Sequence, residues 1–499
     1  MNPRLLLWSG LLTARLASAA DSSPGQALFE TPPGPIVLTN ADAQGSALRS
    51  FALPVAAMRG AVVIVAADLK AEQVSAKPQP WNGIKLMIKV EAPEGTTWPQ
   101  AEIPVGTFPW RHYATRVTIP SEATAATLVV GLERVSGAVE FDQVRVLLRR
   151  VWQPAPPAPP TQPIFRGHVM PRLRGAMVSP HLTEADLAVL ADEWHANLIR
   201  WQLIRSNQEE AADPGPDGYD RWLAGMLAKT DQVLGWAKRH GVMVVVDLHS
   251  PPGGKASAGG YVAAMGSFFT DPAAQQHFLE VWRTMARRFK GNPVIWGFDL
   301  VNEPVDDQAS ERCQDWQGLA LTAGQAIRVI DPGRTLIVEP PQWGSPAGWR
   351  GFNPLPLPGI VYSFHMYEPG RFTHQRVFDK RQTPVAYPGD IEGQRWDRAR
   401  LVQAMQPAID FARRYRVQMY VGEFSAIRWA PGAERYLAAL TRIFEDQGWD
   451  WSYHAFREWD GWSLEYDSDE NHHRPSPRPT ARFAVLENWW RQNQPATAP

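Results

Sequence analysis

The sequence predicts an α/β protein in which a (β/α)8 TIM barrel is preceded by an all-β sandwich of the jelly-roll type. After a proline-rich segment, strand-like and helix-like runs alternate almost to the end of the chain, as in βα units around a parallel sheet. Before that segment, short apolar or alternating runs are separated by turn residues, which is typical of a β-sandwich. A barrel needs only about 250 residues, so a chain of 499 residues is expected to hold two domains.

Residues 1–20 have the features of a secretory signal peptide. Arg4 precedes an apolar run at residues 5–12, and small residues at 17–20 fit a cleavage site. The apolar run is too short to cross a bilayer. We therefore expect a secreted protein, extracellular or periplasmic, with no membrane anchor.

Residues 21–152 are predicted to form the β-sandwich. Residues 110–120 and the last run, 137–148, resemble strands of jelly-roll carbohydrate-binding modules. Trp81, Trp98 and Trp110 are candidates for a sugar-binding platform, because indole faces stack on the C–H faces of sugar rings. The alternative is a purely structural domain. The strand-like runs are 60–66, 84–90, 113–119, 127–132 and 137–148.

Residues 153–164 are predicted to be a linker. Six of the ten residues from 154 to 163 are proline. Proline cannot join a helix interior or a central strand, and it favours extended polyproline geometry. The segment is therefore expected to act as a semi-rigid spacer.

Residues 165–495 are predicted to form the barrel, because eight strand candidates can be counted there. The strand candidates are 173–178, 196–202, 242–248, 294–298, 335–338, 360–364, 418–421 and 449–453. The main helical patterns between them are 220–240, 271–290, 400–416 and 433–447.

Glu303 and Glu423 each stand at the tip of a strand-like run, within residues 294–304 and 417–425. Burying a carboxylate costs free energy, so a carboxylate at the tip of an apolar strand usually has a chemical role. The active site of a (β/α)8 barrel lies at the C-terminal ends of the strands, so both groups are expected at one mouth. Paired carboxylates are the working groups of glycosidases.

The other strand ends are also polar or aromatic. They carry Arg200, His249, Asn302, His365, Tyr367 and Trp459. With the two glutamates, these residues make motifs that resemble glycoside hydrolase family 5 of clan A over residues 165–490. The motifs are Asn-Leu-Ile-Arg, Val-Asp-Leu-His, Asn-Glu-Pro, Ser-Phe-His-Met-Tyr, Gly-Glu-Phe and Glu-Trp-Asp-Gly-Trp.

The resemblance implies a retaining mechanism, with Glu303 as acid/base and Glu423 as nucleophile. Arg200 and Tyr367 would keep Glu423 ionised and in place.

In the same scheme Asn302 would bind the sugar 2-hydroxyl, and Trp459 would stack under the sugar. His249 and His365 would bind hydroxyls or orient Glu303. Glu339, after the fifth strand, is expected to cap a loop or pair with an arginine. Trp343, Trp349, Trp429 and Trp462 are candidates for stacking on further sugar units.

We therefore expect a cellulase-like glycoside hydrolase that cleaves β-1,4-linked glucan. The alternatives are a β-mannanase or another β-glycanase, and, from another class, a catalytically dead glycan-binding barrel. The expected partner is a polysaccharide or oligosaccharide, and the protein is expected to be a monomer.

Composition and motifs argue against other partners and cofactors. The formal net charge is −1 and no basic patch stands out, so nucleic acid and anionic membranes are not expected partners. The single cysteine, Cys313, cannot form an internal disulfide. Residues 467–471 have the oxygen spacing of a calcium loop, but His472 replaces the required glycine. No cofactor or metal is expected.

Overall fold

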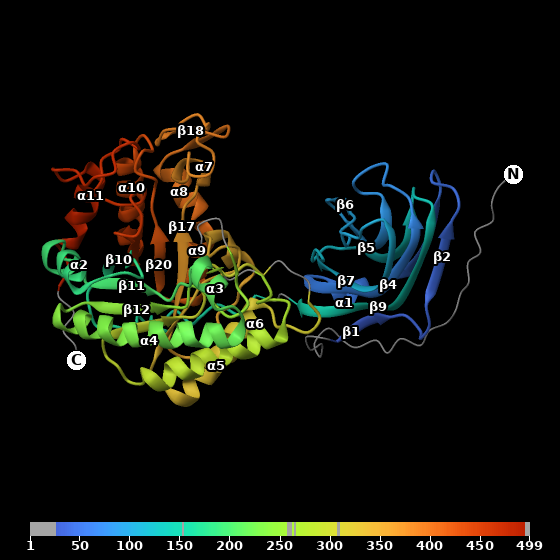
Figure 1. Cartoon of the computed structure of the whole chain (residues 1–499), viewed down its shortest axis with the longest axis horizontal. Coiled ribbons are helices and arrows are strands. Elements are labelled where there is room, and N and C mark those ends of the chain that lie inside the picture. The colour runs from blue at the N-terminus through green and yellow to red at the C-terminus, as the bar shows by residue number, and fades with distance from the viewer. Residues whose placement is uncertain (1–25, 152–153, 257–261, 264–265, 307–309, 495–499) are drawn as a thin grey trace. The chain divides into compact units, whose positions relative to one another are not determined.

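The computed structural model describes residues 26–151, 154–256, 262–263, 266–306 and 310–494. The predicted signal segment, residues 1–20, lies outside these ranges. The chain divides into two compact units, which Figure 1 colours blue to cyan and green to red. The first unit takes the described residues before Gln153 and a short segment that ends at Glu311, and the second takes the rest.

The first unit is built from two antiparallel sheets. One has the order β1-β9-β4-β7 with β2 also paired to β9, and the other has the order β3-β8-β5-β6. The strands are β1 (Ala27–Glu30), β2 (Ile36–Asn40), β3 (Ser46–Ala52), β4 (Ala61–Val74), β5 (Gly83–Ala92), β6 (Gly95–Thr97), β7 (Gly106–Thr118), β8 (Ala125–Glu133) and β9 (Gly137–Val151), and one short helix, α1, covers Val55–Met58.

One hydrophobic core lies between these sheets. Alternate residues of β4, such as Val63 and Val65, pack in one cluster with Leu128 and Val130 of β8. Period-two burial of this kind is what a β-sandwich requires. The predicted all-β sandwich is therefore confirmed as two facing sheets.

The three tryptophans proposed as a sugar platform are exposed. Trp81, Trp98 and Trp110 expose 61%, 56% and 45% of their surface, which is far more than core residues do. The Lys70 ammonium lies 5.3 Å from the centre of the Trp110 ring. Their role in sugar binding remains a prediction.

The proline-rich segment lies against the second unit. The backbone N–H of Ala155 donates to Asn353, and that of Ala158 donates to the carbonyl of Arg414. Arg416 in turn donates to the carbonyl of Gln162, 2.7 Å away. These contacts hold the described part of the segment on its own unit, whereas the sequence predicts a spacer.

The second unit is a closed barrel of eight parallel strands (Figure 1), as predicted. The strands in order around the barrel are β10 (Arg174–Val178), β11 (Leu198–Gln202), β12 (Met243–Asp247), β15 (Ile295–Asp299), β16 (Thr335–Val338), β17 (Ile360–Met366), β20 (Met419–Phe424) and β21 (Asp450–Phe456), and β21 pairs with β10 to close the ring. Two short hairpins, β13 (Lys255–Ala256) with β14 (Val262–Ala263) and β18 (Gly389–Ile391) with β19 (Gln394–Trp396), lie outside the barrel sheet.

Helices surround the barrel strands. They are α2 (Glu184–Ala188) with a π-helical extension Val189–Glu193, α3 (Asn207–Ala212), α4 (Gly215–Arg239), α5 (Pro272–Arg288), α6 (Trp316–Ile330), a 3-10 turn Pro346–Gly351, α7 (Gly370–Thr373), α8 (Arg398–Ala404), α9 (Gln406–Tyr415), α10 (Ala433–Gln447) and α11 (Ala481–Trp490). The predicted helix over 400–416 is two helices, because Pro407 cannot donate a backbone hydrogen bond and starts a new helix instead. No helix within the described ranges is both long and apolar enough to cross a bilayer.

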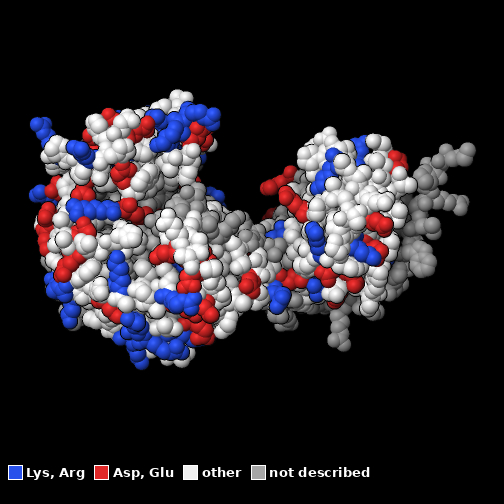
Figure 2. Space-filling model, in the orientation of Figure 1, with Lys and Arg blue, Asp and Glu red and all other residues white. Residues whose placement is uncertain are grey.

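Apolar side chains fill the barrel interior near the N-terminal ends of the strands, its lower end. The interior is polar near the C-terminal ends of the strands, its upper end. Leu173, Leu198, Val245, Trp296 and Tyr420 belong to a small apolar cluster that occupies the interior. Buried charged side chains nearer the C-terminal ends of the strands include Arg200, Asp247, Asp299 and Glu423. Figure 2 shows positive and negative side chains interspersed over the visible face, in keeping with a net charge near zero.

Three of the predicted site residues lie within strands. Arg200, His365 and Glu423 fall inside β11, β17 and β20. β11 ends at residue 202 as predicted, whereas β17 runs two residues beyond the predicted end at 364 and β20 runs three residues beyond the predicted end at 421. Since side chains alternate along a strand, these three point into the barrel mouth while their neighbours pack outside. The prediction that His365 and Glu423 follow their strands is wrong in this detail, whereas Arg200 lies inside its strand as in the predicted run 196–202.

Candidate active site

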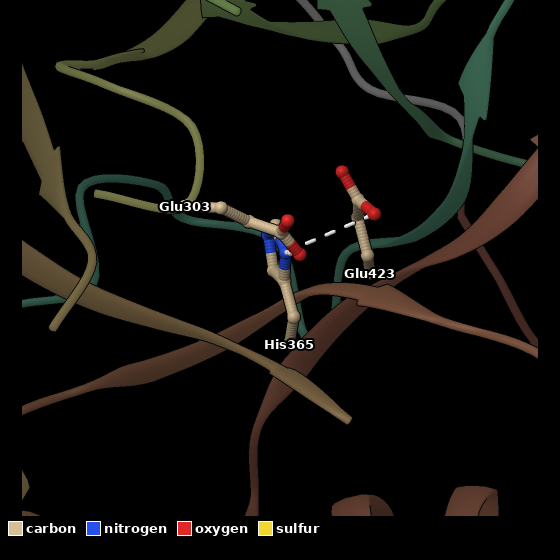
Figure 3. Close-up of side chains that lie close together, drawn as sticks. All are labelled: Glu303, His365 and Glu423. Atoms are coloured by element: carbon tan, nitrogen blue, oxygen red, sulfur yellow. Dashed lines mark hydrogen bonds and ion pairs between the residues drawn. The ribbon is translucent and has the colours of Figure 1, made fainter. Parts of the chain in front are cut away.

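Glu303, His365 and Glu423 meet at the C-terminal end of the barrel. One polar atom from each lies within 4.8 Å of the others. Figure 3 shows the His365 ring directly beside the Glu303 carboxyl, with Glu423 facing both. His365 Nδ1 is 2.8 Å from Glu303 Oε1 and 3.8 Å from Glu423 Oε2. The two predicted carboxylates are therefore brought together, and His365 Nδ1 lies within 3.8 Å of both.

Glu303 sits in the loop after β15 with a left-handed backbone, φ +45°. A non-glycine residue in this region costs about 1–3 kcal/mol and needs its surroundings to hold it. Its backbone N–H donates to Glu339 Oε2 at 2.8 Å, and its carboxyl is hydrogen-bonded to His365. The side chain is about one-quarter exposed, so it is open to a ligand from the mouth.

Glu423 lies inside β20 and is almost fully buried. Arg200 Nη1 donates to its Oε1 at 2.6 Å, and the Tyr367 hydroxyl donates to its Oε2 at 2.8 Å. The preceding Gly422 leaves room for His365, because a Cβ there would come within 2.9 Å of His365 Nε2. The predicted contacts of Arg200 and Tyr367 with Glu423 are both present.

Arg200 serves four carboxylates. Its fully buried guanidinium lies within 3.1 Å of oxygens from Asp247, Asp299, Glu339 and Glu423. A planar guanidinium has five N–H donors and can therefore pair with four carboxylates at once, whereas an ammonium has only three. Arg200 is thus the centre of a buried network of ion pairs, and Glu423 is one of its four partners.

Glu339 has a larger role than the sequence suggested. It pairs with Arg200 as expected, with 2.9 Å between Nη2 and Oε1. It also lies 3.1 Å from His365 Nε2 and accepts the backbone N–H of Glu303. This one carboxylate therefore contacts three of the groups that define the site.

The two candidate glutamates have opposite electrostatic settings. Burial raises the pKa of Glu303, and the charges of Glu423 and Glu339 add to that, although the hydrogen bond from His365 opposes it.

Burial on its own would also raise the pKa of Glu423. The positive charges of His365, His454, Arg200 and His249 outweigh it and hold the pKa of Glu423 well below its ordinary value. His365 and His454 contribute more than Arg200, the residue expected from the sequence to keep Glu423 ionised. Glu303 is set to hold a proton and Glu423 to lose one.

Asn302 and His249 contact the neighbours of Glu303 and Glu423 and form no hydrogen bond with the carboxyl groups of those two residues. The Asn302 side-chain oxygen accepts from Arg200 Nη2 at 3.1 Å. His249 Nδ1 is 2.8 Å from Asp247 Oδ2, which fixes the ring. Of the two histidines considered for orienting Glu303, the structure places only His365 in contact with it.

The aromatic candidates fall into two groups. Trp459 and Trp343 expose 41% and 48% of their surface, enough to meet a ligand. Trp349 is packed against Phe411 in the core, so it cannot stack on a sugar. Trp462 is 8% exposed and its ring lies 6.3 Å from that of Tyr367, between the site and Trp459.

The sequence reading missed a histidine and a glutamate at the end of β21. His454 lies near Glu423, and its ring centre is 6.2 Å from that of Tyr367. Glu458 is 3.5 Å from His454 Nε2 and accepts from Gln202 at 2.9 Å. Both residues lie between residue 453, the predicted end of the eighth strand, and Trp459, so inspecting every polar residue there would have found them.

The Glu303, His365 and Glu423 atoms are also close enough to hold a metal ion. Metal binding would require a neutral imidazole. Burial would lower the pKa of His365, but the charges of Glu339 and Glu423 and the bond to Glu303 raise it well above its ordinary value. An acid–base function therefore suits this cluster better than a metal site.

Comparisons with known proteins find relatives of this chain. The family model described as cellulase (glycosyl hydrolase family 5) matches residues 161–460. Endoglucanase C of Acetivibrio thermocellus is 26% identical over 272 residues, 49% of this chain and 75% of that protein. Cellodextrinase A of Ruminococcus flavefaciens is 25% identical over 274 residues, 53% of this chain and 75% of that protein.

A solved structure of a glycoside hydrolase covers 64% of this chain and 99% of its own, with a TM-score of 0.51 and 20% identity, which shows a shared fold. The family model spans more than half of the chain. The chain therefore belongs to the cellulase family, glycosyl hydrolase family 5, and is a glycoside hydrolase.

Proposed function

We propose that this protein cleaves β-1,4-linked glucan with retention of anomeric configuration, through Glu303 and Glu423. The observation that carries the proposal is the pair itself: two carboxyl groups within 4.8 Å at one barrel mouth, with pKa values shifted in opposite directions. Retaining glycosidases have carboxyl groups about 5–5.5 Å apart, whereas inverting enzymes leave room for a water between them.

In the first step Glu423 attacks the anomeric carbon. The bond between that carbon and the glycosidic oxygen breaks, and the proton of Glu303 moves to the leaving oxygen. A covalent glycosyl–Glu423 ester results. Arg200 and Tyr367 hold the two oxygens of Glu423 before the attack, so little rearrangement is needed.

In the second step Glu303, now ionised, takes a proton from water as the water attacks the same carbon. The ester bond to Glu423 breaks and the carboxylate returns to its starting state. Two inversions give net retention. His365 touches Glu303 at 2.8 Å and can stabilise it while it is ionised between the two steps.

The neighbouring residues have substrate-binding roles in this proposal. Asn302, whose oxygen is held by Arg200, has its amide N–H groups to offer the sugar 2-hydroxyl. His249 is fixed by Asp247 and offers Nε2 to a hydroxyl. The exposed ring of Trp459 is a stacking surface for the sugar, and that of Trp343 for a further unit.

The choice of β-1,4-glucan rests on the relatives. The two relatives described above are named an endoglucanase and a cellodextrinase. Turnover of carboxymethyl cellulose, lichenan, mannan, xylan and xyloglucan should rank the cellulose derivative and lichenan first. A higher rate on mannan would instead assign a β-mannanase.

The mechanism is tested with Glu423→Ala. The variant should lose nearly all hydrolysis of an aryl β-cellobioside, and azide should restore turnover by forming an α-glycosyl azide in the emptied site. Proton NMR of the wild-type reaction should show the β-anomer first. Unchanged turnover by Glu423→Ala would contradict the proposal, and binding without any turnover by the wild type would favour a dead, glycan-binding barrel.

We further propose that the first unit binds polysaccharide through Trp81, Trp98 and Trp110, and that the protein is exported. The full chain with all three tryptophans changed to alanine should keep its rate on soluble substrate but lose retention on insoluble cellulose. The matched control is Phe378→Ala, which removes an exposed aromatic from the second unit. Equal retention by both variants would assign a structural role to the first unit.

A further inference from the structure

Arg428, five residues after Glu423, is a buried cation surrounded by backbone carbonyls. The residue is 1% exposed. Its Nη1 donates to the carbonyls of Asp467, at 2.8 Å, and Asp469. Its Nη2 donates to those of Glu470, at 3.2 Å, and His472, at 2.8 Å. Four carbonyl dipoles of one loop therefore converge on a single guanidinium.

The loop concerned, residues 458–473, has no regular helix or strand. Its carbonyls have no ladder to join, so they need another donor. The backbone N–H of Arg428 also donates to the carbonyl of Gly461 at 2.9 Å, which ties the start of the loop to the same residue. Arg428 thus contacts the loop at both ends.

The side chains of this loop are arranged around the same charge. Asp460 and Asp467 place carboxylate oxygens 3.8 and 3.9 Å from the guanidinium nitrogens. His473 Nδ1 is 2.7 Å from Asp460, and His472 Nδ1 is 2.8 Å from Asp467. The oxygen-rich spacing that resembles a calcium loop is thus explained by an internal cation, the Arg428 guanidinium.

Arg428 also contacts Trp429, the first of a series of aromatic rings that ends at Tyr367. Its Cζ lies 5.5 Å from the Trp429 ring centre. The Trp429 ring meets the Trp459 ring edge-on at 6.1 Å, and Trp459 meets Trp462 at 5.7 Å. Trp462 reaches Tyr367, which donates to Glu423. An unbroken set of contacts runs from the buried cation to the nucleophile.

We propose that Arg428 is a positioning residue that sets sugar binding: its guanidinium acts as the internal cation around which residues 458–473 fold, and so fixes Trp429 and Trp459. This inference rests on the proposed function, in that Trp459 binds sugar. Lysine cannot replace arginine, because one ammonium has three donors and no plane, whereas the guanidinium serves four carbonyls from two nitrogens.

Substitution of Arg428 should therefore affect binding more than chemistry. In Arg428→Ala, KM for cello-oligosaccharides should rise about tenfold or more, since each tenfold is 1.4 kcal/mol, the scale of one lost aromatic contact. kcat should change by less than about threefold, because Glu303 and Glu423 keep their partners. The KM of Arg428→Lys should lie between that of the wild type and that of Arg428→Ala. Arg442→Ala, an exposed arginine on α10, is the matched control and should leave both constants unchanged.

The decisive measurement is whether added guanidinium ion, the group that Arg428→Ala lacks, restores the KM of that variant. Guanidinium chloride at about 10–20 mM, far below denaturing molar concentrations, should restore KM in Arg428→Ala, while equal sodium chloride should not. A purely structural role predicts a lower melting temperature without such rescue. Wild-type KM in a folded Arg428→Ala protein would overturn the inference, as would a raised KM that guanidinium leaves unchanged.

Hydrogen exchange gives a readout that needs no activity. Residues 458–473 should exchange faster in Arg428→Lys than in the wild type, while the barrel strands remain protected. Arg428→Lys serves if the alanine variant does not fold. Unchanged exchange in that loop would also refute the inference. Failure of the proposed function would show separately, as wild-type turnover that survives Glu423→Ala.

Discussion

The backbone N–H of Glu303 donates a hydrogen bond to the side chain of Glu339, with 2.8 Å between nitrogen and Oε2. The bond holds the left-handed backbone of the acid/base candidate. The other oxygen of Glu339 faces Arg200 and His365. Glu339 thus joins the backbone of one glutamate to the cations that act on the other.

Glu339→Gln should lower activity and shift its pH dependence. The negative charge of Glu339 raises the pKa of Glu303. Without that charge the pKa of Glu303 falls, so the proton needed by the leaving group is lost at lower pH. The alkaline limb of kcat/KM against pH should move toward acid, and kcat should fall by about 10²-fold, the scale of one lost catalytic contact. Glu434→Gln, on the exposed face of α10, is the control; coincident pH profiles would contradict the prediction.

Glu303→Ala should discriminate between leaving groups. A dinitrophenolate departs without a proton, so the first step on dinitrophenyl β-cellobioside should slow by less than about tenfold. Cleavage of cello-oligosaccharides, whose leaving alkoxide must be protonated, should slow by 10²–10⁴-fold, the usual contribution of general acid catalysis. Pre-steady-state kinetics should then show a burst, because the second step has lost its base. Equal losses on both substrates would remove Glu303 from the acid role.

The barrel and the approximate positions of its site residues could be predicted from the sequence, because buried parallel strands are continuous apolar runs and the residues after them face the mouth. The hydrogen-bond and ion-pair partners of these site residues could not be predicted from the sequence. Arg200 pairs with four carboxylates, which lie in or directly after four other strands. His365 contacts groups 62 and 58 residues away in the chain. Such contacts depend on how the barrel closes.

His454 and Arg428, which lie outside the family motifs, were missed for the same reason. His454 lies within β21 and would be an ordinary polar residue without the fold. Glu339 was expected to pair with an arginine, but its contacts with His365 and with the backbone of Glu303 were not expected. Arg428 has four carbonyl partners that lie about forty positions further along the chain. No periodicity or motif marks such a residue, because carbonyl groups are common to every sequence.

Asp299→Asn should flatten the pH dependence of stability. Burial raises the pKa of Asp299 well above its ordinary value, although Arg200 opposes this. The folded state therefore binds a proton that the unfolded chain releases above about pH 4. By linkage, stability falls as the pH rises from there toward the pKa of folded Asp299. Asparagine mimics the neutral acid and cannot ionise, so the stability of Asp299→Asn should not fall in this way as the pH rises.

Melting curves of the wild type and Asp299→Asn between pH 4 and 8 test this. The variant should gain stability relative to the wild type as pH rises, while its carbonyl still accepts from Arg200. Asp231→Asn, which alters an exposed pair with Arg288, should give a curve parallel to the wild type. A constant difference between wild type and Asp299→Asn across the range would show that Asp299 is ionised in the folded protein.

Asp450 should be a stability residue that activity does not need. It is fully buried at the start of β21, at the end of the barrel away from the glutamates. It accepts from the backbone of Leu173 and the side chain of Gln418, each at 2.8 Å, and from His168 at 3.1 Å. Asp450→Ala leaves these donors buried without a partner, and breaking a buried charged pair costs about 3–5 kcal/mol.

Urea unfolding followed by tryptophan fluorescence should show the barrel transition of Asp450→Ala at lower urea. At a temperature where the variant is folded, kcat and KM should equal those of the wild type, since Glu303 and Glu423 are held by other strands. Asp450→Asn keeps one acceptor and should lose less stability than alanine. A fall in kcat with an unchanged urea midpoint would mean instead that the lower end of the barrel sets the geometry of the carboxylates at its mouth.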